Sequence, residues 1–297
     1  KDAIKPNLVQ TLEGNPAILH GGPFANIAQG TNSVFATHVG MSLGDYTVTE
    51  AGFGCDLGAE KFLNIKCQTA GLRPKAVVIT TTIRALKYHD LKALEKGMPN
   101  LEKHLDSILQ FDLTPVIAIN RFTTDSDEEI QVIKDAANRL GVRVAVANVW
   151  AHGGDGAVEL AQLVVAAIEE GKSNFKPLYS MDMSIEDKIH TIATKIYGAS
   201  GVEYAAKAKA DLRIIKNLGL EGSAVCVAKT QKSLTDDPKL LGRPTDFQIT
   251  VREIEIAAGA GFVVPITGSI MRMPGLPAHP SSEKIDIDAE GNITGLF

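Results

Sequence analysis

Residues 76–82 read Ala-Val-Val-Ile-Thr-Thr-Thr, a short run of apolar and β-branched side chains. A run without alternation between apolar and polar positions is typical of a strand buried on both faces of a parallel sheet. Residues 115–120, Pro-Val-Ile-Ala-Ile-Asn, repeat the pattern after an intervening helical segment. The sequence therefore predicts an α/β fold in which helices cover both faces of a parallel sheet.

Strand and helix patterns continue to alternate on either side of these two runs. Further strands are predicted at Tyr46–Glu50 and Val142–Val149. Predicted helices are Thr31–Met41, Leu57–Leu72, Asn100–Gln110, Asp125–Leu140 and Asp155–Glu170. Residues 1–14 resemble the end of a helical region that stops at Gly14, and Lys1 stands where an initiator Met would be, so we expect the chain to begin inside a longer protein.

The rhythm of the sequence changes after Pro177, and a second domain is predicted there. Two helices (Ile185–Tyr197 and Val202–Leu218) and three strands (Ala224–Ala228, Asp246–Ile256 and Phe262–Ile266) are expected, with Gln231–Pro244 as an exposed or substrate-ordered loop. Residues 271–297, with three prolines, are expected to run over the surface. The predicted domains are therefore residues 1–178 and residues 179–297.

The composition excludes several classes of protein. The 297 residues carry a net charge of −5 with both signs interspersed, and no basic patch of the kind that binds nucleic acid is present. No apolar run is long enough for a membrane helix, and no signal peptide is recognisable. The three cysteines are an odd number without metal-like spacing, which favours reduced thiols in a cytoplasmic protein.

Unusual residues follow several of the predicted strands, at the positions where parallel sheets bind ligands. Glu50 and Asp56 flank small residues and could hold Mg²⁺ or polarise a substrate, although Asp56 is equally suited to capping the next helix. Arg84 and Lys87 follow three threonines, which suits either a phosphate or carboxylate site or a solvated loop. Residues 20–26, with Gly21 and Gly22, could approach a ligand closely or form a tight turn.

Two further strand ends carry aromatic residues. Phe122 follows Asn120 and Arg121, and Trp150 precedes a loop that contains Gly153 and Gly154. The two rings could clamp a flat heterocycle, and ordinary core packing is the alternative. Glycines at the beginning of a predicted helix suit an anion.

Several of these segments resemble the formate–tetrahydrofolate ligase family, in the same order and over nearly the whole chain. Residues 82–89, Thr-Ile-Arg-Ala-Leu-Lys-Tyr-His, resemble one family signature, with Asp90-Leu91 where the family has two glycines. The other matching segments are residues 5–11, 20–26, 50–62, 116–122, 149–154 and 273–277.

The resemblance implies an enzyme that uses ATP to join formate to tetrahydrofolate through formyl phosphate, giving 10-formyltetrahydrofolate. It implies a P-loop fold similar to that of dethiobiotin synthetase, a homotetramer, Mg²⁺, and a monovalent cation (K⁺ or NH₄⁺). Residues similar to Phe122 and Trp150 stack on the folate ring in that family. Arg84 and Glu50 then become candidate catalytic residues, Asn120, Gly153 and Gly154 candidate nucleotide-binding residues, and Asp56 a candidate metal ligand.

The sequence contains no Gly-x-x-x-x-Gly-Lys-[Ser/Thr] phosphate loop. In the family this loop and a second, glycine-rich signature belong to the amino-terminal half. We therefore expect this chain to be the carboxy-terminal part, to supply the folate-binding residues, and to be inactive alone. Two alternatives stay open: a non-catalytic folate-binding or assembly module, and another ATP-dependent carboxylate ligase of the P-loop class.

Overall fold

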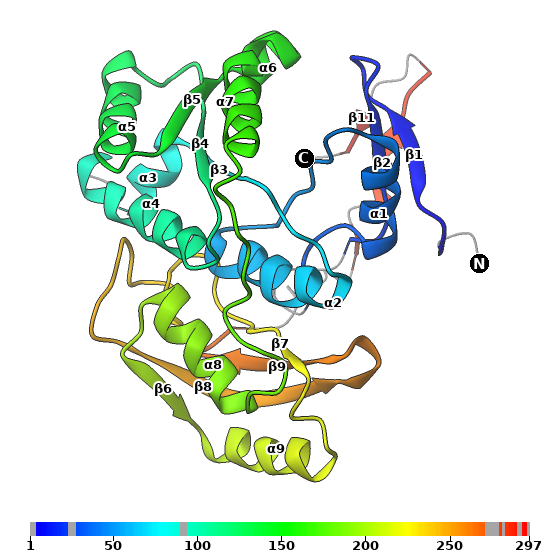
Figure 1. Ribbon diagram of the computed structural model, residues 1–297, viewed down its shortest axis with the longest axis vertical. Coiled ribbons are helices and arrows are strands. Elements are labelled where there is room, and N and C mark those ends of the chain that lie inside the picture. The colour runs from blue at the N-terminus through cyan, green and yellow to red at the C-terminus, as the bar shows by residue number, and fades with distance from the viewer. Residues whose placement is uncertain are drawn as a thin grey trace.

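The computed structural model describes residues 4–22, 28–89, 94–270, 279–280, 283–289 and 293–295. A three-stranded parallel sheet and a four-stranded mixed sheet occupy the upper and lower halves of the view in Figure 1. This arrangement confirms the predicted α/β class with a parallel sheet. The narrower assignment to the P-loop type stays a prediction.

The parallel sheet consists of β3 (Val77–Thr81), β4 (Pro115–Asn120) and β5 (Arg143–Ala147), in that order. β4 is the central strand, and its first five residues are all buried. This explains why its sequence is a continuous apolar run, since both of its faces lie under helices. The strands predicted at 76–82, 115–120 and 142–149 are confirmed to within two residues at each end.

Four helices accompany this sheet: α3 (Ile83–His89), α4 (Leu94–Leu109), α5 (Asp127–Arg139) and α7 (Val158–Glu169). α4 and α5 lie on one side of the sheet and α7 on the other (Figure 1). α5 begins with a capping box, in which the side chain of Ser126 accepts from the Glu129 amide and the Glu129 side chain accepts from the Ser126 amide. Its acidic first turn also complements the helix dipole, as the sequence predicts.

The second sheet has the strand order β6-β8-β9-β7. Its strands are β6 (Gly201–Tyr204), β7 (Ala224–Val225), β8 (Gln248–Ala257) and β9 (Phe262–Thr267). β8 and β9 are antiparallel, whereas β6 pairs with β8 and β7 with β9 in parallel. The accompanying helical segments are α8 (Ile185–Thr191), η5 (Ile192–Tyr197) and α9 (Ala206–Asn217).

The helical expectation for residues 1–14 is wrong over its described part. Residues 7–19 form an antiparallel hairpin of β1 (Asn7–Gln10) and β2 (Pro16–Leu19), in which Asn7 pairs with Leu19. Gly14, read as a helix terminus, instead has φ of 81° in the turn of the hairpin. The same left-handed conformation serves both structures, so the glycine alone does not distinguish them. The hairpin is followed by α1 (Val34–Leu43), the helix predicted at 31–41.

Three other expectations need correction. Residues 46–50 form no strand, and the helix expected at 202–218 begins only at Ala206, because residues 201–204 are taken into the sheet as β6. The loop at 231–244, expected to be exposed or ordered by substrate, is buried from Ser233 to Thr235. The expectation that residues 271–297 run over the surface falls mostly outside the described residues. In the described part of this segment, the short strands β10 (Asp286–Ile287) and β11 (Ile293–Thr294) form a small antiparallel pair.

The helix predicted at 57–72 is present, but most of it is wider and less tightly wound than an α-helix. It is built from η2 (Cys55–Ala59), η3 (Phe62–Cys67) and α2 (Gln68–Ala70), of which the first two are π-helical. Every residue from Leu63 to Cys67 is buried. Gly58 is required because a Cβ there would stand 1.8 Å from the carbonyl oxygen of Gly52. Wide helical turns of this kind are frequent at functional sites.

An apolar cluster of the described residues runs through both halves of the chain. It joins Ile117 and Ile119 of β4 with Ile192 of η5 and Val251 of β8. The two sheets lie on either side of the predicted boundary at residue 178, which stays a prediction. Within the described residues, no helix combines the length and the apolar character needed to cross a membrane.

The three cysteines are free thiols inside this structure. Cys55, Cys67 and Cys226 are all buried. Burial raises the pKa of Cys55 and Cys67 to about 12 and that of Cys226 to about 11. They therefore remain protonated and unreactive near neutral pH.

Candidate functional site

The carboxyl ends of the three parallel strands lie at one edge of the sheet. Thr81 pairs with Ile119, and Asn120 pairs with Ala147. The Arg121 amide continues the pairing by donating to the carbonyl oxygen of Ala147 at 3.1 Å. The segments that follow the strands therefore start from neighbouring positions, at the edge where open α/β sheets bind ligands.

Arg84 and Phe122 meet at this edge, although they follow different strands. Arg84 lies in the first turn of α3, where the Thr82 hydroxyl accepts from the Ala85 amide at 2.9 Å. Phe122 lies in a tight turn after β4, where its amide donates to Oδ2 of Asp125 at 2.8 Å. The guanidinium carbon of Arg84 is 5.6 Å from the centroid of the Phe122 ring, a cation–π distance. Two of the predicted site residues are thus brought together.

The other cations near this edge are already neutralised. Lys87 forms an ion pair with Glu129 of α5, and Arg121 forms one with Asp127 at 2.9 Å. Arg84 forms no ion pair with the described residues. A guanidinium that rests only against an aromatic face keeps its N–H donors for a ligand carboxylate or phosphate.

Trp150 follows β5 in α6 (Val149–His152), a single helical turn. Its side chain is 82% exposed, and that of Phe122 is 42% exposed. Ordinary core packing, the alternative for these rings, would bury them, so it does not describe either residue. Two exposed aromatic rings that follow adjacent strands provide a surface for a flat ligand.

The glycines after α6 give this loop its shape. Gly153 has φ of 55° and ψ of −138°, a conformation that side chains disfavour. A Cβ at Gly156 would stand 2.3 Å from the carbonyl oxygen of Asn148, whose own amide donates to the Gly156 carbonyl at 2.9 Å. The amide of Gly154 donates to Oε1 of Glu13 at 2.7 Å. In this structure a carboxylate of the chain itself occupies that anion position, and nucleotide binding by Gly153 and Gly154 stays a prediction.

A shallow groove of about 500 Å³ begins at Gly154 and continues along the outer face of α7. It is lined mainly by small apolar side chains: Ala157, Val158, Ala161, Val165 and Ala166. The loop after Trp150 therefore opens onto an apolar surface.

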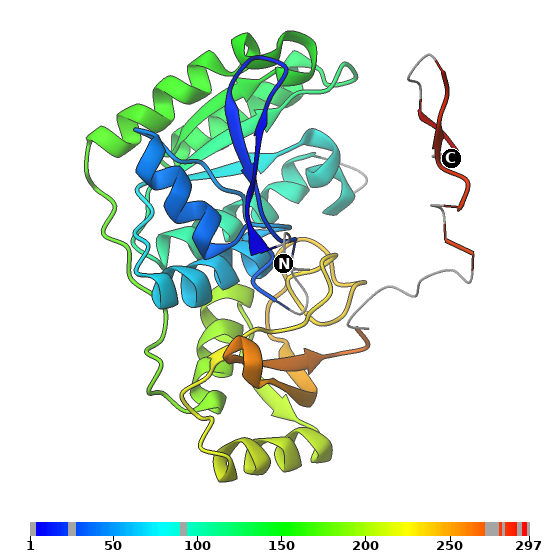
Figure 2. The same ribbon diagram turned by 90° about the vertical axis from the view of Figure 1, so that its right-hand side faces the viewer.

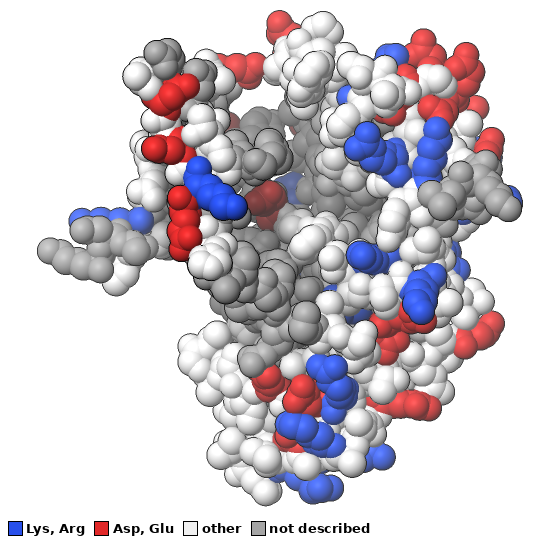
Figure 3. Space-filling view, turned by 180° about the vertical axis from the view of Figure 1, so that it is seen from behind, with Lys and Arg blue, Asp and Glu red and all other residues white. Residues whose placement is uncertain are grey.

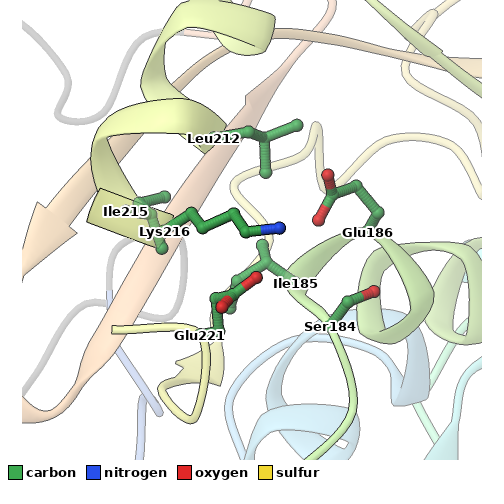
Figure 4. A pocket seen from close by; sticks show the side chains of 7 residues that line it. All are labelled: Ser184, Ile185, Glu186, Leu212, Ile215, Lys216 and Glu221. Atoms are coloured by element: carbon green, nitrogen blue, oxygen red, sulfur yellow. The ribbon is translucent and has the colours of Figure 1, made fainter. Parts of the chain in front are cut away.

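A second hollow, of about 240 Å³, lies between α8 and α9 in the carboxy-terminal half (Figure 4). Lys216 extends between Glu186 and Glu221, with the apolar side chains of Leu212 and Ile185 on either side of it (Figure 4). The oppositely charged side chains that line this hollow face one another, and none of the predicted site residues is among its lining residues. On the face seen in Figure 3, acidic and basic side chains of the described residues are likewise interspersed.

A sequence model of the formate–tetrahydrofolate ligase family matches residues 1–297. The chain belongs to this family. The resemblance carried by residues 82–89 and the other segments is thereby confirmed, and membership supports formate–tetrahydrofolate ligase activity in general.

In this ligase chain Asp56 is buried in an ion pair. Its Oδ2 lies 2.8 Å from Nζ of Lys229, with side-chain exposures of 7% and 0%. Burial alone would raise the pKa of Asp56, but the charge of Lys229 and its hydrogen bond lower it below the usual range. The described residues contain no group of three His, Cys, Asp or Glu side chains that could hold a metal ion. Asp56 therefore takes part in a buried ion pair, and its role as a magnesium ligand stays a prediction.

Around this ion pair lies a buried polar cluster that the sequence analysis missed. Glu60 is fully buried, its Oε1 accepts from Nδ2 of Asn64 at 2.7 Å, and its Oε2 has no hydrogen-bond partner among the described residues. Burial raises the pKa of Glu60 to about 7. The ammonium of Lys229 also lies 5.3 Å from the centroid of the Tyr197 ring. The sequence does carry a sign of this cluster, because the charged residues Glu60, Lys61 and Lys66 lie within an otherwise apolar helical segment.

For two other predicted residues, Glu50 and Asn120, the contacts in the structure do not show a role in the site. Glu50 is exposed ahead of η2 and makes no hydrogen bond or ion pair with the described residues. Asn120 ends β4 with a half-buried side chain, next to the turn that holds Phe122. Phe53 was not predicted, yet it has φ of 63°, a conformation that bulky residues rarely adopt outside strained functional segments.

Proposed function

We propose that this chain supplies the folate-binding part of an enzyme that joins formate to N10 of tetrahydrofolate with the cleavage of ATP to ADP and phosphate. The observation that carries the proposal is the pair of exposed rings, Phe122 and Trp150, with the Arg84 guanidinium against one of them. The pterin and aminobenzoyl rings of tetrahydrofolate are flat and stack on aromatic side chains. The carboxylates of folate and the reacting phosphoryl group are anions. Either of them could pair with the guanidinium of Arg84, which has no ion-pair partner among the described residues.

The reaction needs an activated formate, because formate itself is a poor electrophile. An oxygen of formate attacks the terminal phosphorus of ATP, the bond from that phosphorus to the ADP oxygen breaks, and ADP leaves with the electron pair. Nitrogen N10 of tetrahydrofolate then attacks the carbonyl carbon of formyl phosphate. The carbon–oxygen bond to phosphate breaks, phosphate leaves, and N10 loses its proton to give 10-formyltetrahydrofolate.

Each step makes a physical demand that side chains of this site can meet. The acyl phosphate must be shielded from water and held close to the amine. The ring platform would fix the folate, and Arg84 would offset negative charge as it develops on the phosphoryl group. We further propose that Glu50 polarises a substrate, that Asn120 contacts the adenine edge, and that Gly153 and Gly154 line the nucleotide.

We propose that the chain works together with a further polypeptide segment that carries the phosphate loop, and that it is inactive alone. Both outer strands of the parallel sheet, β3 and β5, have one unpaired edge among the described residues. Val78 of β3 is 41% exposed, and the groove along α7 is apolar. Such surfaces support the idea that more of the α/β domain packs here.

Mg²⁺, a monovalent cation, a homotetrameric assembly and a cytoplasmic location are part of the same proposal and rest on the family resemblance.

The proposal is tested by measuring formation of 10-formyltetrahydrofolate from formate, ATP and tetrahydrofolate. The chain would be assayed alone and mixed with a family polypeptide that contains the phosphate loop. Turnover only in the mixture is expected. Tetrahydrofolate binding without turnover in either sample would favour the non-catalytic folate module, an alternative supported by the absence of a phosphate loop from this sequence. Turnover with another carboxylate but not with formate would favour a different ligase.

A further inference from the structure

The tip of the first hairpin is an ordered turn that presents one carboxylate. The Thr11 amide donates to the carbonyl oxygen of Asn15 at 2.8 Å, and the Gly14 amide donates to the carbonyl oxygen of Thr11 at 2.9 Å. The Asn15 amide also donates to the Thr11 hydroxyl at 3.0 Å. Glu13 therefore extends from a braced turn, and in Figures 1 and 2 the tip of the hairpin lies near α6.

Glu13 reaches the loop after Trp150, which is 141 residues away in the sequence. Its Oε1 accepts from the amide of Gly154 at 2.7 Å, a distance typical of a strong, charge-assisted hydrogen bond. The contact leaves little room for a side chain at either glycine while the Glu13 carboxylate keeps this position. A Cβ at Gly153 would stand 2.1 Å from Oε1 of Glu13, and one at Gly154 would stand 3.0 Å from Oε2. The hairpin carboxylate and the two glycines thus fit one another.

Trp150 depends on this loop for its position because it has little packing of its own. Its side chain is 82% exposed. The His152 amide donates to the carbonyl oxygen of Asn148 at 3.2 Å, and the Asn148 amide donates to the carbonyl oxygen of Gly156 at 2.9 Å. These bonds close a small loop, and Glu13 ties the far side of that loop to the hairpin.

We infer that Glu13 is a positioning residue of the tetrahydrofolate site: its carboxylate holds the Gly153–Gly154 backbone and thereby fixes the Trp150 ring for stacking. The inference rests on the proposed function, which gives tetrahydrofolate as the ligand. The way in which Glu13 acts rests on its hydrogen bond to Gly154. A platform that is held in its binding geometry before the ligand arrives binds more tightly, since less freedom is lost on binding.

The test uses Trp150, the single tryptophan of the sequence, as a local reporter. Acrylamide quenching and anisotropy of Trp150 are measured without ligand, and tetrahydrofolate is then titrated while quenching is followed. The variants are Glu13→Ala, Glu13→Gln, and Glu203→Ala as a matched control that removes an exposed carboxylate from β6. Circular dichroism and melting temperature establish that each variant is folded.

Glu13→Ala is expected to lower the anisotropy, to increase acrylamide quenching, and to raise the Kd for tetrahydrofolate about five- to thirty-fold. This is less than the direct loss of one charged hydrogen bond to a ligand would give, because Glu13 acts on the ligand only through Trp150. Glu13→Gln should recover most of the affinity because the amide oxygen accepts the same bond. Wild-type values of both Kd and quenching in Glu13→Ala would overturn the inference.

The ligand-free measurements separate this inference from the proposed function. Absence of tetrahydrofolate binding by the wild-type chain would count against the proposed function. In that event the anisotropy and quenching of Glu13→Ala still decide whether Glu13 positions Trp150. Gly154→Ala provides a second variant, because its Cβ would stand 3.0 Å from Oε2 of Glu13 and would displace the carboxylate. It should reproduce the effect of Glu13→Ala on Trp150, and an unchanged Trp150 signal in this variant would contradict the inference.

Discussion

The carboxylate of Asp56 lies 2.8 Å from the ammonium of Lys229 and joins two distant parts of the chain. Asp56 belongs to η2, next to the parallel sheet, and Lys229 follows β7 of the second sheet. Lys229 also donates to the carbonyl oxygens of Thr230 and Ser233. The ion pair therefore connects the two halves and orders the segment that was expected to be an exposed or substrate-ordered loop.

Replacing Lys229 with Met is expected to lower the free energy of unfolding by about 3–5 kcal/mol, because it leaves the Asp56 carboxylate buried without a counter-charge. The double variant Asp56→Asn/Lys229→Met should recover a large part of this loss. Urea denaturation at pH 7 measures both. Losses that simply add in the double variant would show that the two side chains are not coupled.

Glu60 is expected to make stability depend on pH. Its folded pKa of about 7 lies above the usual value of 4.5, so the folded state retains a proton that the unfolded state loses between these values. Stability contributed at this site is therefore complete below about pH 4.5 and falls as pH rises to about 7. The variant Glu60→Gln cannot ionise and should gain about 3 kcal/mol relative to wild type across this window.

Denaturation of wild type and Glu60→Gln from pH 4.5 to pH 8 gives this difference directly. Glu203→Gln, at an exposed position, serves as the control. A difference between Glu60→Gln and wild type that is constant over the whole range would mean that Glu60 does not titrate as the structure implies.

Arg84 is expected to matter for turnover more than for folding, since its side chain is exposed and forms no ion pair with the described residues. In the assembled ligase, Arg84→Ala should reduce kcat/KM about ten- to a hundred-fold, the effect of losing a charged hydrogen bond to a ligand. Arg84→Lys should recover only part of the activity, because lysine lacks the planar fork of donors. Lys172→Ala provides a control at an exposed cation, and unchanged turnover in Arg84→Ala would remove Arg84 from the mechanism.

The parallel sheet could be predicted because its determinants are local. β4 is an apolar run bounded by Pro115 and Asn120, and Ser126 with Glu129 marks the start of α5. The position of Phe122 after a buried strand then follows from the rule that ligands bind at the carboxyl ends of strands. Arg84 and Phe122 were singled out separately on these grounds, and the structure brings them into contact.

The missed features depend on contacts between residues far apart in the sequence. The hairpin at 7–19 resembled a helix end because one glycine conformation serves both structures, and only the pairing of Asn7 with Leu19 distinguishes them. The residues of β6 were assigned to α9 because four residues are too few for a strand pattern. The Asp56–Lys229 pair and the contact of Glu13 with Gly154 leave no local pattern at all.

The central claim is that Phe122 and Trp150 form the platform for tetrahydrofolate. The most direct measurement is a titration of tetrahydrofolate followed by Trp150 fluorescence, corrected for ligand absorbance, in wild type and in Phe122→Ala. Saturable quenching by wild type and a roughly tenfold or larger increase in Kd in the variant are predicted, since loss of a stacked ring costs about 1–3 kcal/mol. Equal affinities of the two proteins would contradict the claim, and so would the absence of any response from the folded chain both alone and with the phosphate-loop polypeptide added.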